Sequence, residues 1–170
     1  ISLKTYPGFA RLGDYIYSNY GVMFNLPMAY IEKTFLIDDT RQIFLIRHLF
    51  NFIIFFISSI FFYLLLKKRF SKLLSTIGLL FFYLSPRIFA ESFYNNKDII
   101  FLSFFIISLF YAINFLNTPS YKNIFLLSIT SSLAIATRVM GIIIPFIVLI
   151  VFVLRYLDRK KDIKKNIFKI

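Results

Sequence analysis

Long runs without a full charge alternate with short polar connectors along most of this sequence. Residues 49–66 carry no charge over 18 positions. At about 1.5 Å per residue, a helix of that length is about 27 Å long, close to the hydrocarbon thickness of a bilayer. Residues 99–121 form a second run, of 23 uncharged positions. Both runs therefore predict helices that span a membrane.

A shorter apolar run, residues 73–86, lies between these two. Its 14 residues would form a helix of about 21 Å, which is short for a membrane span. Lys72 and Arg87 at its ends can extend their charged groups towards the membrane surface. A helix that continues to Ala90 would also lengthen the crossing, so we predict a span here.

Two more spans are predicted towards the C-terminus, at 123–137 and 141–154. The first carries small hydroxyl side chains, which favour close helix packing in membranes and indicate a place inside the bundle. These are Ser128, Thr130, Ser131, Ser132 and Thr137. In the second, Pro145 is expected to bend the helix near its start. The fold predicted from these runs is an all-α polytopic bundle of about five membrane spans.

The ends of the chain are more polar than its middle. Residues 1–42 are rich in tyrosine, glycine and proline, as expected of a segment at the headgroup level, and 28–37 resembles a short amphipathic surface helix. The run Asp38-Asp39-Thr40 offers an N-cap for the next helix. We therefore divide the sequence into an exoplasmic segment (1–42), a helix bundle (43–157) and a basic connector (158–170), and expect a fragment of a longer protein.

Composition excludes several classes of protein. The sequence is 59% hydrophobic with a mean hydropathy of +0.76, well above the range of a soluble domain. It has no cysteine and a single histidine, His48, so disulfide frameworks and zinc clusters are excluded. The net charge of +12 lies between apolar runs and forms no continuous stripe, so we expect membrane lipids as partners and no nucleic acid.

The distribution of charge predicts an orientation. The 67–72 connector, Lys122 and the C-terminal tail together carry 12 basic residues, with Asp158 and Asp162 as their acids. The other connectors and the N-terminal segment carry eight basic residues and the remaining six acids. Because basic residues accumulate on the cytoplasmic side, the tail is predicted to be cytoplasmic. The N-terminal segment and residues 86–98 would then lie on the exoplasmic face.

Several ionisable residues would meet on that face. Arginine binds phosphate through two hydrogen bonds and lysine acts as a point charge. A carboxylate can accept a proton from an attacking hydroxyl or hold a divalent cation. This combination suits a site for a phosphate-linked lipid. The candidate residues are Asp14, Arg87, Glu91, Lys97, Asp98 and Arg138.

Five of the six candidates, all except Arg138, also have a purely structural interpretation. Asp98 could be only the N-cap of the following helix. Arg87 and Lys97 could simply extend to the membrane interface. Glu91 lies one helical turn from Arg87, so the two could form a local ion pair. Asp14 lies in a Gly-Asp-Tyr sequence that is common in turns.

Three stretches resemble the GT-C superfamily of membrane glycosyltransferases, which includes the protein O-mannosyltransferases and the lipid A aminoarabinose transferases. Residues 20–30 resemble the end of the family's first exoplasmic loop, and 46–51 resemble the Arg-Leu opening of the next span. Residues 85–98 look like its second exoplasmic loop, in which a proline ends one helix and an aspartate opens the next. The resemblance covers most of the sequence as a loose pattern.

The resemblance implies transfer of a sugar from a polyprenyl-phosphate donor to a glycan, lipid or protein acceptor, at the exoplasmic face of a membrane, most simply a bacterial inner membrane. Asp98 would be the second-loop acid, near the donor or a divalent metal. Lys97, Arg87 and Arg138 would face the lipid phosphate. The family's Asp-Glu pair is absent, so the base is either Asp14 or a residue upstream.

The sequence departs from the family at one further position, and other functions are also compatible with a membrane bundle. Some relatives carry glutamate where this sequence has Asn25, which cannot act as a base. A transporter or flippase of lipid-linked saccharides is the alternative, and a non-catalytic membrane protein is a third. A transporter predicts polar residues near the middle of its spans. The spans here are almost free of charge, which disfavours that alternative.

Overall fold

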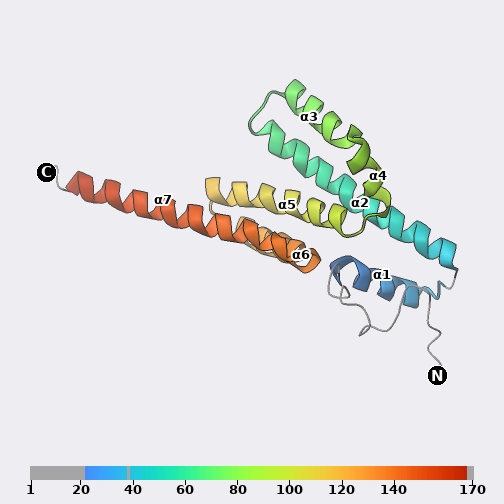
Figure 1. Cartoon of the computed structure of the whole chain (residues 1–170). Helices are drawn as coiled ribbons and strands as arrows, with labels where there is room; N and C mark the ends of the chain where they lie inside the picture. The colour runs from blue at the N-terminus through green and yellow to red at the C-terminus, as the bar shows by residue number, and fades with distance from the viewer. Residues whose placement is uncertain (1–21, 38, 168–170) are drawn as a thin grey trace.

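A computed structural model describes residues 22–37 and 39–167, and within these ranges the chain forms helices and no strand (Figure 1). The predicted all-α bundle is confirmed. In chain order the helices are α1 (Val22–Thr34), α2 (Thr40–Lys67), α3 (Lys72–Leu84), α4 (Pro86–Tyr94), α5 (Asp98–Asn117), α6 (Tyr121–Thr137), the 3₁₀ helix η1 (Val139–Ile142) and α7 (Ile143–Ile167).

The N-terminal helices differ from the prediction mainly in their bounds. The expected surface helix at 28–37 exists as α1, but it begins six residues earlier and ends at Thr34. The predicted N-cap of α2 is confirmed, because the Asp39 carboxylate accepts a hydrogen bond of 3.0 Å from the Arg41 amide. With 28 residues, α2 begins well before the uncharged run at 49–66. The first turns of α2 therefore extend beyond residues 49–66, the part whose length matches the thickness of a bilayer.

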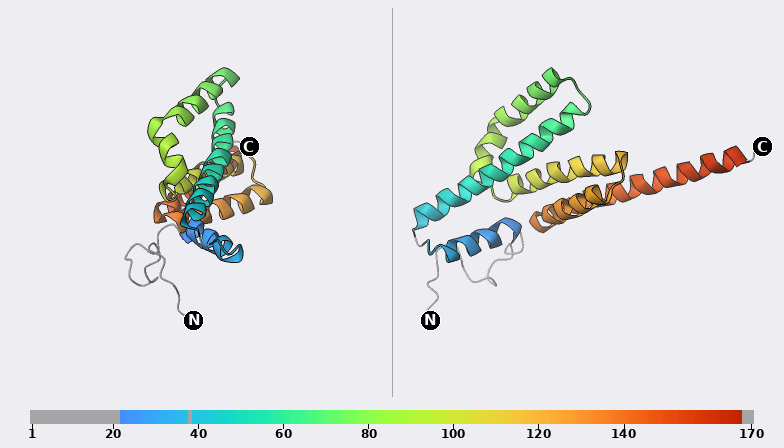
Figure 2. Two further views of the ribbon diagram at one scale, coloured as in Figure 1. Left: turned by 90° about the vertical axis from the view of Figure 1, so that its right-hand side faces the viewer. Right: turned by 180° about the vertical axis from the view of Figure 1, so that it is seen from behind.

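The span predicted from the run at 73–86 is broken. The chain does not continue straight from α3 to Ala90, because α3 and α4 meet at an angle of 61° (Figure 2). Ser85 separates the two helices, and Pro86 is the first residue of α4. Proline is well suited to that place, since the first turn of a helix leaves its amides without intrahelical partners. The bend turns α4 back onto α2, where Phe93 stacks on Phe52.

Helix α6 runs antiparallel to α5 and leads through η1 into α7. Of the five hydroxyl residues predicted to lie inside the bundle, Thr130, Ser131 and Thr137 are buried, whereas the other two are exposed. The irregularity expected at Pro145 lies earlier, in η1. Pro145 itself falls in the first turn of α7, where its missing amide leaves no helical hydrogen bond unmade.

Among the described residues, three stretches are long and apolar enough to cross a membrane: α2, α5 and residues 139–157 of η1 and α7. The bent pair of α3 and α4 would make a fourth. At 17 residues, α6 is shorter than these, at the lower limit of about 17 residues for a span. It nevertheless packs against α5 in the opposite direction, so the span at 123–137 stays a prediction.

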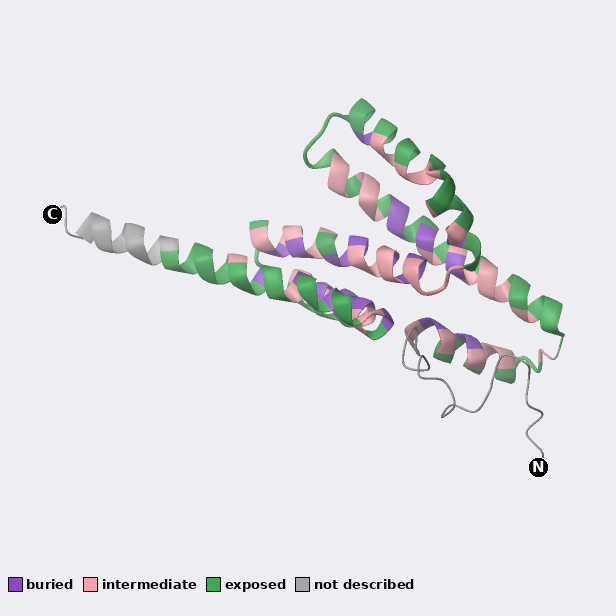
Figure 3. Ribbon diagram, viewed as in Figure 1, coloured by how far each residue is buried: buried purple, intermediate pink, exposed green. Residues whose placement is uncertain are grey.

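The core is divided between the two ends of α5. One cluster joins Phe24 and Met28 of α1 to Ile100, and the other joins Ala112 and Phe115 to α6 and α7. Buried positions accordingly follow one face of α1, α5 and α6, whereas the visible faces of α3 and α7 are largely exposed (Figure 3). These exposed faces are rich in leucine, isoleucine and phenylalanine, as expected of helices whose outer surface meets lipid.

Contacts between helices define two ends of the bundle. At the first, which we call the Asp98 end, the start of α5 meets Arg138 at the end of α6. At the other, the Asn117 end, Lys68 and Arg155 contact the last two turns of α5. Thus α2, α5 and α7 run from the Asp98 end to the Asn117 end, and the bent α3–α4 pair and α6 run back.

Candidate functional site

The candidate site is built around the loop that joins α4 to α5, at the Asp98 end. This loop is fixed to α2 by Asn51, whose buried side-chain amide donates a hydrogen bond of 2.9 Å to the carbonyl of Ser92. Asn51 lies two residues after the start of the uncharged run of α2. The loop therefore lies beside the start of the uncharged run of α2, where that helix would enter the hydrocarbon layer of a membrane.

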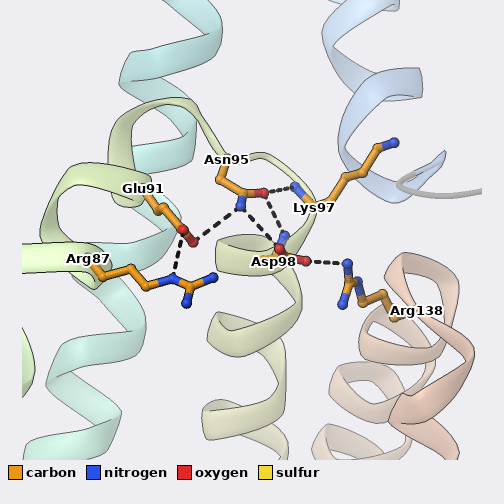
Figure 4. A network of polar contacts seen from close by, with 6 residues as sticks. All are labelled: Arg87, Glu91, Asn95, Lys97, Asp98 and Arg138. Carbon is orange, nitrogen blue, oxygen red and sulfur yellow. Dashed lines mark hydrogen bonds and ion pairs between the residues drawn. The ribbon is translucent and has the colours of Figure 1, made fainter.

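Asn95 organises the loop with four hydrogen bonds (Figure 4). Its carbonyl oxygen accepts from the backbone amides of Lys97 at 3.2 Å and Asp98 at 2.9 Å. Lys97 occupies the N-cap position of α5 and makes no side-chain cap hydrogen bond, so the Asn95 oxygen takes up these free amides in its place. Its side-chain amide donates to Glu91 Oε2 at 3.2 Å and to Asp98 Oδ2 at 3.1 Å. One side chain thus caps α5 and holds two carboxylates beside each other.

Asp98 therefore does not act as the cap considered for it. It is the first residue of α5, and the capping oxygen belongs to Asn95. The Asp98 carboxylate instead forms an ion pair with Arg138, which comes from the end of α6. A carboxylate in the first turn is also favoured by the helix dipole. The exposed fractions of the two side chains are 44% for Asp98 and 42% for Arg138, although the Asp98 Oδ1 atom that faces Arg138 is itself buried.

The remaining candidates are placed differently. Arg87 and Glu91 form the local ion pair considered above, with 3.1 Å between Nε and Oε1. Arg87 is 86% exposed, whereas Glu91 is 20% exposed and also bonded to Asn95. The Lys97 side chain points away from both carboxylates (Figure 4). Within the described ranges its ammonium group has no ion-pair partner. Asp14 lies outside the described residues.

A third ion pair, between Glu32 of α1 and Arg47 of α2, was not predicted. It is bidentate, with distances of 2.6 and 3.0 Å, and both side chains are largely buried. Next to it, the Asn96 side chain donates a hydrogen bond of 3.1 Å to Asn25. These two contacts hold α1 against α2 and against the α4–α5 loop. Asn25 thus has a structural partner.

Sequence reasoning overlooked Asn95, although one signal was present. Asparagine is among the most favoured residues at helix N-caps, and Asn95 precedes the uncharged run at 99–121 by four positions. Glu32 and Arg47 gave no such signal. They are 15 residues apart on different helices, so only the packing of α1 on α2 brings them together.

The oxygen ligands for a divalent metal are limited in the part of the chain that is described. Glu91 and Asp98 are linked through the Asn95 side-chain amide, which donates to both carboxylates. No group of three or more His, Cys, Asp or Glu side chains occurs among the described residues. These two carboxylates suit a hard cation such as Mg²⁺, which is often bound by one or two carboxylates together with substrate phosphates.

Comparison with known proteins agrees with this architecture. The chain matches no curated protein and no solved structure. The family model of dolichyl-phosphate-mannose-protein mannosyltransferase matches residues 23–170, which covers every described helix except the first residue of α1. This match, together with the apolar helices, identifies an integral membrane glycosyltransferase of the GT-C type. The chain belongs to the dolichyl-phosphate-mannose-protein mannosyltransferase family.

Proposed function

We propose that this chain binds a polyprenyl-phosphate-linked sugar at the Asp98 end and transfers the sugar to a glycan, lipid or protein acceptor. The observation that carries the proposal is the set of charges around Asn95. Two carboxylates share its side-chain amide, and each has an arginine as its ion-pair partner. The set lies level with the start of the uncharged run of α2, where a lipid phosphate would meet it.

The charge of the set suits the donor. The ion pairs Arg87–Glu91 and Asp98–Arg138 are each neutral overall, and Lys97 adds one positive charge. A sugar linked to a polyprenyl phosphate is a phosphodiester with one negative charge. Lys97 has no competing carboxylate in the described part of the chain, so it is the cation most available to the phosphate. Arg138, 42% exposed, would be the second phosphate contact.

The transfer itself needs few groups from the protein. The acceptor oxygen forms a bond to the anomeric carbon of the sugar while the bond from that carbon to the phosphate oxygen breaks. The leaving polyprenyl phosphate keeps the electron pair, and the acceptor proton passes to a carboxylate base. Asp98 would orient the donor, whereas Asp14, outside the described residues, or a residue upstream would be the base. A divalent cation held by Glu91 and Asp98 would draw negative charge from the leaving phosphate.

The site is proposed to face the exoplasm of a bacterial inner membrane, and labelling can test this. Because the 170 residues contain no cysteine, Tyr94→Cys and Tyr121→Cys can be compared directly. Tyr94 ends α4 at the Asp98 end and is 61% exposed, and Tyr121 begins α6 near the Asn117 end and is 95% exposed. On intact cells a membrane-impermeant maleimide is expected to label Tyr94→Cys alone. After permeabilisation both should react, and labelling of Tyr121→Cys alone on intact cells would reverse the topology.

The donor role of Lys97 makes a kinetic prediction. Replacing Lys97 by Gln is expected to raise the KM for the polyprenyl-phosphate sugar about ten-fold, since a charge-assisted hydrogen bond contributes about 1.5–3 kcal/mol. The kcat should change much less. Lys97→Arg, which keeps the charge, should recover part of the lost affinity. Lys33→Gln removes an exposed lysine from α1 and should leave KM unchanged. An unaltered KM in Lys97→Gln would remove Lys97 from the donor site.

A further inference from the structure

Charge is distributed differently at the two ends of the bundle. The three ion pairs of the described residues all lie at the Asp98 end or on the neighbouring α1. At the Asn117 end, the side chains that the structure describes include six cations and no carboxylate. These cations are Lys67, Lys68, Arg69, Lys72, Lys122 and Arg155. This end therefore carries an excess of positive charge that the described part of the protein does not neutralise.

Two of these cations are fixed against the end of α5 from different helices. Lys68, just after α2, donates a hydrogen bond to the side-chain carbonyl of Asn114, and its ammonium lies 4.1 Å from the centre of the Phe110 ring. Arg155 of α7 donates a hydrogen bond to the backbone carbonyl of Leu116. Each contact uses part of the donor capacity of the cation, because lysine has three donors and arginine five. Both residues keep donors for a further partner.

The end of α5 does not account for so many cations. The C-terminus of a helix carries the equivalent of about half a negative charge, whereas six positive charges gather here. Partial desolvation also lowers the pKa of Lys68 from its ordinary value, because burial disfavours the charged ammonium. An anion beside Lys68 would favour the ammonium again. Topology accounts for basic residues on this side of the membrane, and an anionic partner there would neutralise them.

The surroundings of these cations indicate what kind of anion it is. Phe70 and Leu73 in the connector and at the start of α3 are 54% and 71% exposed, and Leu154, next to Arg155, is 55% exposed. A small, fully hydrated anion would leave this apolar surface uncovered. An anionic lipid would satisfy both features, because its phosphate would meet the cations and its acyl chains would cover the apolar side chains.

We propose that the Asn117 end binds the phosphate headgroup of an anionic phospholipid, with Lys68 and Arg155 as its principal contacts. This site lies at the opposite end of α5 from Asp98 and does not depend on the identity of the sugar donor. It would hold the ends of α2, α5 and α7 together through one shared anion, in addition to their direct contacts.

The test is lipid binding to the purified full-length protein, measured by native mass spectrometry with phosphatidylglycerol and phosphatidylcholine as probes. Wild type is expected to bind phosphatidylglycerol in preference to phosphatidylcholine. The double variant Lys68→Gln/Arg155→Gln should weaken the binding of phosphatidylglycerol about ten- to thirty-fold, since each basic residue near an anionic lipid surface contributes about a factor of five. Lys68→Arg/Arg155→Lys keeps both charges and should retain most of the affinity.

A matched control has the same charge change at the other end. Lys33→Gln/Arg41→Gln removes one exposed lysine and one exposed arginine near the Asp98 end, and it should bind phosphatidylglycerol as wild type does. Equal weakening in both double variants would mean that total charge, and not this site, governs binding, which would overturn the proposal. So would complete displacement of the lipid by millimolar inorganic phosphate, because the ligand would then be a free anion.

Discussion

Replacing Asp98 by Asn is expected to lower sugar transfer at least a hundred-fold, the range typical of a positioned carboxylate in a reaction that moves protons and phosphate charge. The change keeps the shape of the side chain but removes its charge. Arg138 then loses its ion-pair partner, and any cation shared with Glu91 loses a ligand. Transfer from a polyprenyl-phosphate sugar by the full-length protein in membranes measures the effect.

Two further variants separate catalysis from folding. Asp39→Asn makes the same chemical change at the N-cap of α2, where asparagine caps as well as aspartate does, so its activity should match that of wild type. Asp98→Asn/Arg138→Gln removes both charges of the ion pair. If the pair only stabilises the packing of α5 on α6, the double variant should regain activity. We expect it to remain inactive, and recovered transfer would assign Asp98 a structural role.

The features predicted correctly from the sequence are those that depend on residues within a single helix. The uncharged run at 49–66 predicted the membrane part of α2, and Asp39 predicted its N-cap, because both depend on neighbouring residues alone. The pair of Arg87 and Glu91 was foreseen for the same reason, since they lie one turn apart on α4. The break at Ser85 was implied by the family resemblance, in which a proline ends one helix, but not by the apolar pattern. There the continued apolar pattern suggested one helix, but Pro86 cannot continue the hydrogen bonds of α3.

Contacts between helices were beyond sequence reasoning. Arg138 was expected to join the site through topology, yet its pairing with Asp98 depends on the antiparallel packing of α6 on α5. The same applies to Glu32 and Arg47, which only the position of α1 brings together. Asn95 shows a different limit. Its capping role could be inferred locally, but its bonds to both carboxylates required the turn of the loop to be known.

Gly141→Ala is expected to destabilise the protein by about 2–3 kcal/mol, the upper part of the usual range for overpacking, and to reduce transfer along with it. A Cβ at Gly141 would lie 2.7 Å from the carbonyl carbon of Ala134 and 2.7 Å from the amide nitrogen of Ile135. These are backbone atoms of α6, so they cannot move aside as a side chain could. The 3₁₀ helix η1 would have to separate from α6.

That separation would also disturb the candidate site, because the Gly141 amide donates a hydrogen bond of 2.9 Å to the carbonyl of Arg138. Thermal unfolding of the purified protein and transfer in membranes measure the two effects. Gly78→Ala is the matched control. Its Cβ would meet only the end of the Leu66 side chain, which can rotate, and alanine is favoured over glycine inside a helix. Unfolding of Gly141→Ala at the wild-type temperature would show that η1 and α6 are not so closely packed.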